Sequence, residues 1–258
     1  MTHPERRSSS PLVTRLAPLR GRPTQPAVLA ELRRVILAGD APPGSVIPLD
    51  DVAAAFGMSV IPVRESLKIL IGEGLVEQHM RGAYTVARLS RSELLELYTA
   101  RGVLENTVLA VAVVAAGHAD HTHARAAHDL LDRAVRAGDL RAYHRESREF
   151  HFALLAPARM RRFVGMVESA WNLTESYRPM ALLSDADRQL LHADHGEMLT
   201  AFVARDSAAL LAAAATHHRR LLDAIAAFPP GDAFVDDPSS GASTAVDGQG
   251  PNAPRPSY

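Results

Sequence analysis

The chain has 258 residues, a length that suits two modest domains better than one large domain. Hydrophobic residues make up 47% of it and aromatic residues only 5%, so the cores are rich in Ala and Leu, which favour helices. The absence of cysteine excludes disulfides and thiolate metal sites and predicts a cytoplasmic protein, and no apolar run is long enough to predict a membrane span. A net charge of −1 gives no overall argument for nucleic-acid binding.

Residues 1–23 are rich in Ser, Pro, Thr and Arg and predict a flexible basic arm. Two roles stay open for this arm: a disordered terminus without a task, or a segment that contacts DNA phosphates. Apolar residues recur at helical spacing over Gln25–Ala38, which predicts a first helix that ends at Gly39. A second helix is expected from about Leu49 to Phe56, with Gly57 as its stop.

Ser59 is the expected N-cap of a third helix that continues to Gly72. Two short β-like runs follow, Leu75–His79 and Ala83–Ala87, separated by a hairpin tip. Two helices joined by a glycine-containing turn and followed by a β-hairpin predict a winged helix-turn-helix over residues 24–89.

In a winged helix-turn-helix the third helix enters the major groove with its N-terminal end closest to the bases. Arg64 can form a fork with a guanine edge or a phosphate, and a glycine at the wing tip allows a close approach to the minor groove. The expected DNA-contacting residues are Ser59, Val60, Ile61, Arg64, Lys68, Arg81 and Gly82. From the pattern alone, a small three-helix unit for protein contact remains the alternative, because acidic residues offset the basic ones.

From Ser90 onward the pattern predicts helices and no strand. Ser90 or Ser92 caps a long helix that runs to about Ala116. The further expected helices are 119–137, 139–156, 159–177, 185–204 and 207–227. The fold class is therefore mainly α, with the winged helix-turn-helix followed by an all-α bundle of about six helices over residues 90–228. Residues 229–258 are rich in Gly, Ser, Pro, Ala and Asp and predict a disordered tail.

The stretch from Leu32 to Val86 resembles the DNA-binding domain of the GntR family of bacterial transcription regulators. The resemblance rests on four short runs in the order that the family shows. These runs are Ile36–Gly39, Pro42–Gly44, Pro62–Glu65 and Glu73–Val76. It implies a protein that binds double-stranded operator DNA.

The start of the third helix departs from the family pattern. Members usually have Ser-Arg-Thr-Pro there, whereas this chain has Ser59, Val60, Ile61 and Pro62. An arginine and a threonine that normally contact DNA are thus replaced by apolar residues, and guanine readout from position 60 is lost. We expect either an unusual operator preference that uses thymine methyl groups or a weaker affinity than is typical.

The second half resembles the FCD ligand-binding domain of the FadR-like branch of this family, from about Ser90 to Phe228. The runs that match are Leu97–Ala112, Arg148–Leu155 and Asp194–His218. The resemblance implies a homodimeric regulator, most commonly a repressor, that responds to a small organic acid and is not an enzyme.

Members of the family often hold a divalent metal with one Asp and three His. The resemblance places the three histidines at His151, His195 and His217, and the Asp position falls on Ser147, one helical turn before the first His. His218 is the alternative to His217 if the register shifts by one residue. Three histidines favour Zn²⁺, with water or the effector completing its shell, and the loss of the carboxylate predicts weaker binding. A metal-free pocket whose histidines bind the effector directly remains open.

Arg101 is the expected anchor for the effector, because a guanidinium pairs with a carboxylate through two hydrogen bonds. The alternative is a surface pair with Glu105, four residues later on the same helix. Ser147 and Asn172 are expected in the same pocket. Two other functions stay open: a constitutive DNA-binding regulator without sensing, and a metal-dependent hydrolase, for which no carboxylate stands as a general base.

Overall fold

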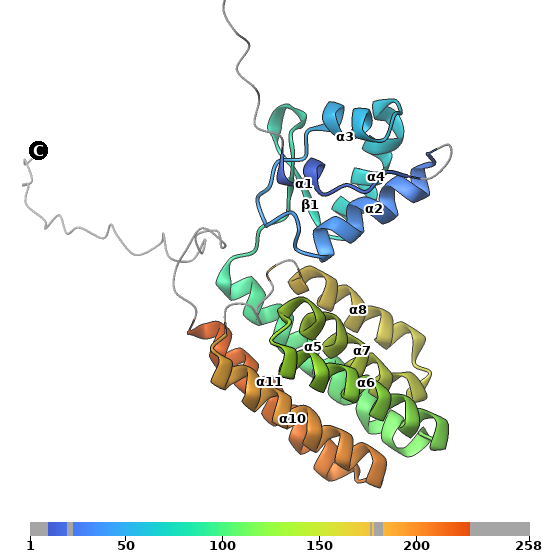
Figure 1. Cartoon of the computed structure of the whole chain (residues 1–258), viewed down its shortest axis with the longest axis vertical. Coiled ribbons are helices and arrows are strands. Elements are labelled where there is room, and N and C mark those ends of the chain that lie inside the picture. The colour runs from blue at the N-terminus through green and yellow to red at the C-terminus, as the bar shows by residue number, and fades with distance from the viewer. Residues whose placement is uncertain (1–9, 20–22, 176, 178–182, 228–258) are drawn as a thin grey trace, which may run out of the picture.

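The computed structural model describes residues 10–19, 23–175, 177 and 183–227. The first nine residues of the expected arm and the whole expected tail, 229–258, lie outside this part of the chain. Figure 1 shows two bodies along the longest axis, a small N-terminal domain above a helical bundle.

The N-terminal domain is a winged helix-turn-helix, as the sequence predicts. Its two strands pair antiparallel with Val76 opposite Val86, and an isolated bridge joins Val46 to Thr85. Gly82 has φ +80° at the hairpin tip, a backbone conformation that favours glycine. The elements are α1 (Pro11–Thr14), α2 (Gln25–Leu37), α3 (Leu49–Ala55), α4 (Val60–Gly72), β1 (Val76–Gln78), η1 (Met80–Gly82) and β2 (Tyr84–Val86).

Residues 10–19 differ from the flexible arm that the sequence predicts. Leu12 on α1 is fully buried in the core of the N-terminal domain, and Ser10 donates a hydrogen bond to the carbonyl oxygen of Val46. The backbone N–H of Ala17 donates to Glu31 on α2, at 2.7 Å. The polar and proline-rich composition of the arm predicts flexibility, but its few apolar residues hold residues 10–19 on the N-terminal domain because their side chains are buried in its core.

The described part of the bundle contains six α-helices, and their ends coincide with capping residues. Ser90 and Glu93 form a capping box at the start of α5, and Gly138, with φ +63°, ends α6. Asp139 and Asp206 accept hydrogen bonds from the first turns of α7 and α11. The elements are α5 (Arg91–Ala115), α6 (His118–Ala137), α7 (Leu140–Leu155), η2 (Ala156–Ala158), α8 (Arg161–Glu175), α10 (Asp185–Ala204) and α11 (Ser207–Ala226).

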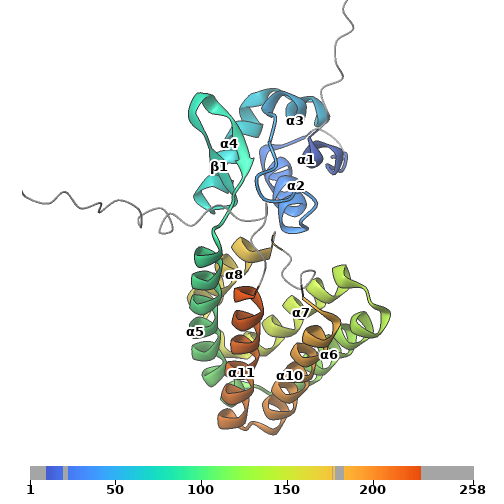
Figure 2. The ribbon, with the colours of Figure 1, turned by 90° about the vertical axis from the view of Figure 1, so that its left-hand side faces the viewer.

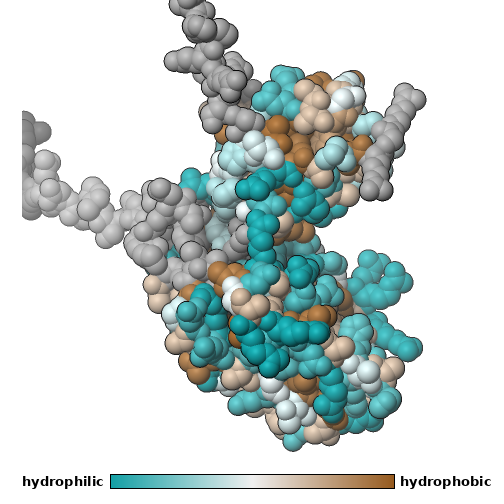
Figure 3. Space-filling view, viewed as in Figure 1, coloured by the Kyte–Doolittle hydropathy of each residue, from teal (hydrophilic) through white to brown (hydrophobic). Residues whose placement is uncertain are grey.

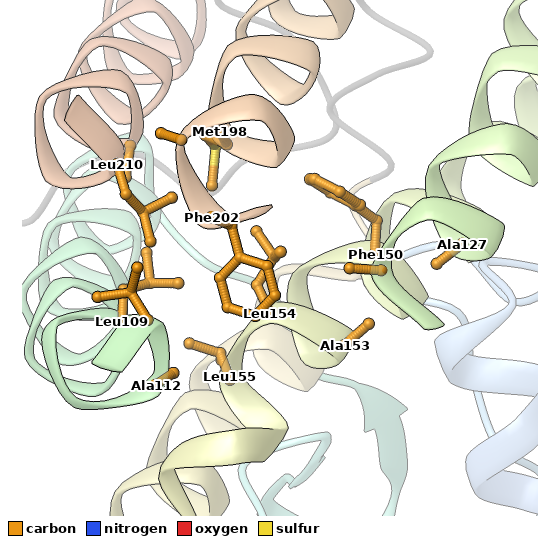
Figure 4. Close-up of a cluster of buried hydrophobic side chains, with 14 of the residues drawn as sticks. Leu109, Ala112, Ala127, Phe150, Ala153, Leu154, Leu155, Met198, Phe202 and Leu210 are labelled. Carbon is orange, nitrogen blue, oxygen red and sulfur yellow. The ribbon is translucent and has the colours of Figure 1, made fainter. Parts of the chain in front are cut away.

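The core of the bundle lies between α5, α7, α10 and α11. Phe202 points inward between Leu109, Leu154 and Leu155, and Figure 4 shows these side chains converging from different helices. Phe150 is fully buried in the same cluster and directly precedes His151 on α7. The packed core therefore fixes the helix faces that carry the polar residues described below.

Helix α5 is long and apolar enough to cross a bilayer by length and composition alone. It packs against α8 and α11, and 44% of its most apolar window is buried inside the protein. On the face drawn in Figure 3, hydrophilic side chains cover most of the bundle and apolar ones form scattered patches. These observations fit the central helix of a bundle, and Figure 2 shows α5 beside α8 and α11.

The two domains contact each other at the ends of α7 and α8. Leu173 of α8 packs against the core of the N-terminal domain, and Arg141 of α7 forms an ion pair with Asp40, at 2.7 Å. The backbone N–H of Leu89 donates to the hydroxyl of Tyr177. The N-terminal domain is thus held against α7 and α8 of the bundle.

Candidate functional site

Three histidines from three helices meet inside the bundle. His151 of α7, His195 of α10 and His217 of α11 are all buried, and each offers a nitrogen within 4.8 Å of the other two. The Nε2 atoms of His151 and His195 lie 3.2 Å apart. The structure therefore brings together the three histidines that the sequence singled out, whereas His218 lies beside them and contacts Glu105.

The donor set fits a divalent metal ion. Two histidine nitrogens on one tetrahedral zinc, each at about 2.0–2.1 Å, lie about 3.3 Å apart, close to the 3.2 Å between His151 and His195. The Nδ1 atoms of His195 and His217 are buried with no hydrogen-bond partner among the described residues. Burial lowers the pKa of all three imidazoles; the neighbouring histidines lower the pKa of His195 and His217 further, whereas Glu105 partly offsets the effect of burial at His151. A lowered pKa favours the neutral ring, which has a free lone pair to offer a metal.

Glu105 of α5 orients His151. Its Oε2 lies 3.1 Å from Nδ1 of His151. Burial alone would raise the pKa of Glu105, but the charge of Arg101 and the hydrogen bond from His151 hold this pKa well below its usual range. Because an ionised carboxylate only accepts hydrogen bonds, Nδ1 carries the hydrogen and the lone pair of Nε2 faces the other histidines. The sequence pattern does not predict this role for Glu105, although its spacing of four residues from Arg101 places both side chains on one helix face.

Arg101 is held rigidly beside these histidines. Its guanidinium lies 4.0 Å from the ring centre of Trp171 and 4.6 Å from that of Tyr98. Its Nε lies 2.9 Å from Glu105, so the pair that the sequence allowed at the surface is present but buried. Stacking and pairing fix the plane of the guanidinium, which preserves its fork geometry for a carboxylate.

A cavity of about 30 Å³ lies beside Arg101, His195 and His217, and we call it the histidine cavity; His151 is not among its lining residues. Ser147 lines it, which places the position of the missing Asp on the same helix face as His151. Asn172 is not among the lining residues; it accepts a hydrogen bond from Arg148 at 2.8 Å. The lining residues are Tyr98, Arg101, Tyr143, His144, Ser147, Trp171, Thr174, Glu175, His195, His217 and Leu221.

The candidate DNA-reading surface lies at the start of α4. Ile61 is 65% exposed, and Arg64 and Lys68 follow at helical spacing and are exposed too. Arg64 forms no ion pair within the described part of the chain, while Lys68 pairs with Glu65 at 2.8 Å. Val60 instead packs partly against the domain core.

The remaining predicted DNA contacts lie at the ends of their elements. Ser59 is the exposed N-cap of α4, and Gly82 is exposed at the wing tip. Arg81 lies in the same short turn, η1. The surface at the start of α4 therefore offers one exposed arginine, one lysine and one apolar side chain.

Two family models match the chain in consecutive regions. Residues 24–86 match the model described as bacterial regulatory proteins, gntR family, and residues 96–220 match the FCD domain. The transcriptional repressor GlaR of Escherichia coli is 27% identical over 185 residues, which cover 69% of this chain and 84% of GlaR. The gluconate operon transcriptional repressor of Bacillus subtilis is 36% identical over 81 residues, 31% of this chain and 33% of the repressor.

Solved structures have the same fold. McbR/YncC of E. coli superposes with a TM-score of 0.70 at 22% identity, covering 78% of this chain and 96% of McbR. A GntR regulator from Rhodococcus sp. RHA1 superposes with a TM-score of 0.68 at 26% identity, covering 78% of this chain and 97% of that one. With both domain models in this order, the chain belongs to the GntR family as a DNA-binding transcription regulator with a C-terminal FCD domain, and it is not an enzyme.

Proposed function

We propose that this regulator is a repressor whose helical domain senses a small organic acid. The observation that carries the proposal is the cavity lined by Arg101, His195 and His217, with His151 close to both of these histidines. The guanidinium supplies a charged fork for a carboxylate, and the enclosing walls exclude competing water. Relatives named as repressors, including GlaR, support the sign of regulation.

A divalent metal, with Zn²⁺ as the first choice, completes the proposed sensor. His151, His195 and His217 would hold it, and Glu105 would orient the first of these rings. When bound, the metal would supply a Lewis-acid site for a carboxylate oxygen of the effector. Ser147 gives no charge to this set, so the net positive charge of the site favours an anionic effector.

The partner arrangement we propose is a homodimer. Val103 and Val114 on α5 are 64% and 71% exposed, and Val111 lies on the same helix face. The neighbouring α8 exposes Phe163 and Met166. Apolar side chains on two adjacent helices favour a self-complementary interface, and a dimer would place two winged domains on a palindromic pair of half-sites. The effector would control binding by favouring one arrangement of these heads.

The DNA-binding surface is tested with Arg64→Ala. We expect the variant to bind its operator roughly 5- to 150-fold more weakly, because one forked base contact contributes about 1–3 kcal/mol. Genomic fragments bound by the wild-type protein supply the operator, and fluorescence anisotropy at fixed salt gives the affinities. Arg125→Ala, on an exposed face of α6, is the matched control. Unchanged affinity and sequence preference in Arg64→Ala would remove this residue from the interface.

The metal site is tested with His195→Ala. We expect the purified wild-type protein to hold about one zinc ion per chain and the variant almost none, because two remaining histidines form too weak a set. Elemental analysis after dialysis measures the content, and His123→Ala, exposed on α6, is the control. Equal zinc in His195→Ala and the wild type would contradict the site. A wild type that binds operator but neither zinc nor any acid would be a constitutive regulator.

A further inference from the structure

A second and much larger cavity lies between the two domains, and we call it the interdomain cleft. Its volume is about 580 Å³. The C-terminal end of α2 forms one wall, and α7 with the end of α8 forms the other; Figure 1 shows this end of α2 directly above the bundle. The lining residues are Arg34, Leu37, Ala38, Leu140, Arg141, His144, Arg145, Arg148 and Glu175.

The two cavities differ in what they can hold. Pockets for small organic ligands measure roughly 300–1,000 Å³. The histidine cavity, at about 30 Å³, has room for an ion or a water molecule or two. The interdomain cleft, at about 580 Å³, has room for the body of an organic molecule.

His144 and Glu175 line both cavities and form the wall between them. Nδ1 of His144 lies 3.9 Å from Oε1 of Glu175, and both side chains are largely buried. A ligand that extends past this pair would place one end beside Arg101 and the histidines and its other end in the cleft. The interdomain space and the proposed sensor are therefore adjacent and share this pair of side chains as a common wall.

The chemistry of the cleft walls fits the apolar body of an organic molecule. Leu37, Ala38 and Leu140 are apolar, and the aliphatic stems of the arginines extend the apolar wall. Four of the lining residues are arginines, and each is paired with a carboxylate outside the lining: Arg34 with Glu31, Arg141 with Asp40, Arg145 with Glu146 and Arg148 with Glu168. Acidic neighbours outside the lining orient these arginines, as Asp40 does for Arg141 at 2.7 Å.

We propose that the interdomain cleft binds the apolar body of an organic carboxylate whose acid group lies toward the histidine cavity. The inference rests on the proposed sensing function and assigns where most of the effector is bound. Such a ligand contacts Leu37 and Ala38 of the DNA-binding domain and Leu140 of the bundle at once. Its affinity then depends on the separation of the domains, which couples binding to the position of the DNA-reading helix.

The test measures how tightly the full chain binds straight-chain acids of increasing length. Acetate, butyrate, hexanoate and octanoate are titrated into the protein by isothermal calorimetry. We expect the affinity to rise about threefold to fourfold with each added methylene, because each one is buried in the cleft. Ala38→Phe fills the cleft and should weaken octanoate binding at least about tenfold relative to wild type, the loss of about two buried methylenes. Ala30→Phe, the same change on an exposed face of α2, should behave like the wild type.

Two results would overturn the proposal: octanoate that binds no tighter than butyrate, or Ala38→Phe that binds octanoate as the wild type does. If Ala38→Phe does not fold, Leu37→Ser asks the same question by removing an apolar wall, and undiminished octanoate affinity there would also overturn it. No binding of any acid by a protein that still binds its operator refutes the cleft and leaves the regulator intact. Cleft-dependent octanoate binding that does not change operator affinity supports the cleft and refutes the proposed sensing function.

Discussion

Arg101→Ala is expected to destabilise the bundle by about 3–5 kcal/mol, the usual cost of removing one partner from a buried ion pair. The side chains of Arg101 and Glu105 are 4% and 1% exposed, so the variant leaves a carboxylate inside the bundle without its main counter-charge. The contacts of the guanidinium with Tyr98 and Trp171 are lost as well. Unfolding in urea, analysed by linear extrapolation, gives the free energy of unfolding of the variant and the wild type.

Two further variants test whether the loss of stability comes from the burial of the ion pair and not from the removal of an arginine as such. Arg136→Ala removes an i, i+4 ion pair with Asp132 of the same helical spacing, but Arg136 is 70% exposed, and we expect a loss below about 1 kcal/mol. The double variant Arg101→Met with Glu105→Gln removes both charges and should recover part of the loss. A loss in Arg101→Ala as small as that in Arg136→Ala would contradict the buried pair.

The sequence predicts the helices of the bundle closely because the chain marks their ends chemically. Ser90 precedes a glutamate at the third helical position, Gly138 stands where α6 must stop, and Pro157 follows α7. These signals act over one helical turn and do not depend on the rest of the fold. The winged domain follows the same rule, since Gly57 and Ser59 separate its second and third helices.

Features that depend on tertiary packing cannot be predicted from such local signals in the sequence. Arg101 and Glu105 share a helix face whether that face is exposed or buried, so spacing alone allowed a surface pair. Leu12 is one apolar residue within a polar segment, and its burial depends on a core formed much later in the chain. Val60 and Ile61 have similar side chains, yet the turn of the helix directs one toward the core and the other outward.

In the candidate site, too, some features can be predicted from the sequence and others arise only from packing. His151 and His195 are 44 residues apart in the sequence, and His195 and His217 are 22 residues apart. These separations match no compact metal-binding motif. The family resemblance identified them, and the structure shows their nitrogens converging. The interdomain cleft has no sequence signal, because Ala38 and Leu140 meet only when both domains have folded.

Ser147→Asp is expected to tighten zinc binding by at least about tenfold. Ser147 lines the histidine cavity with His195 and His217 and lies one turn before His151 on the same helix, so a carboxylate there lies near all three imidazoles. It would add a negatively charged ligand to a set of neutral ones. Residues that merely orient metal ligands contribute about 10- to 100-fold to affinity, and a direct ligand should contribute no less. Competition with a chromogenic chelator measures the affinity.

Ser147→Asp is expected to change the melting temperature in opposite directions without metal and with zinc bound. Without metal, the new carboxylate is buried beside neutral rings and should lower the melting temperature relative to the wild type. With zinc in excess, the tighter binding should raise it above that of the zinc-loaded wild type. Ser147→Asn introduces a side chain of the same shape without the charge. Its melting temperature should fall less without metal and rise less with zinc than that of Ser147→Asp. Equal zinc affinity in the Asp and Asn variants would mean that position 147 does not reach the metal, and Arg101 with the three histidines would then define the sensor alone.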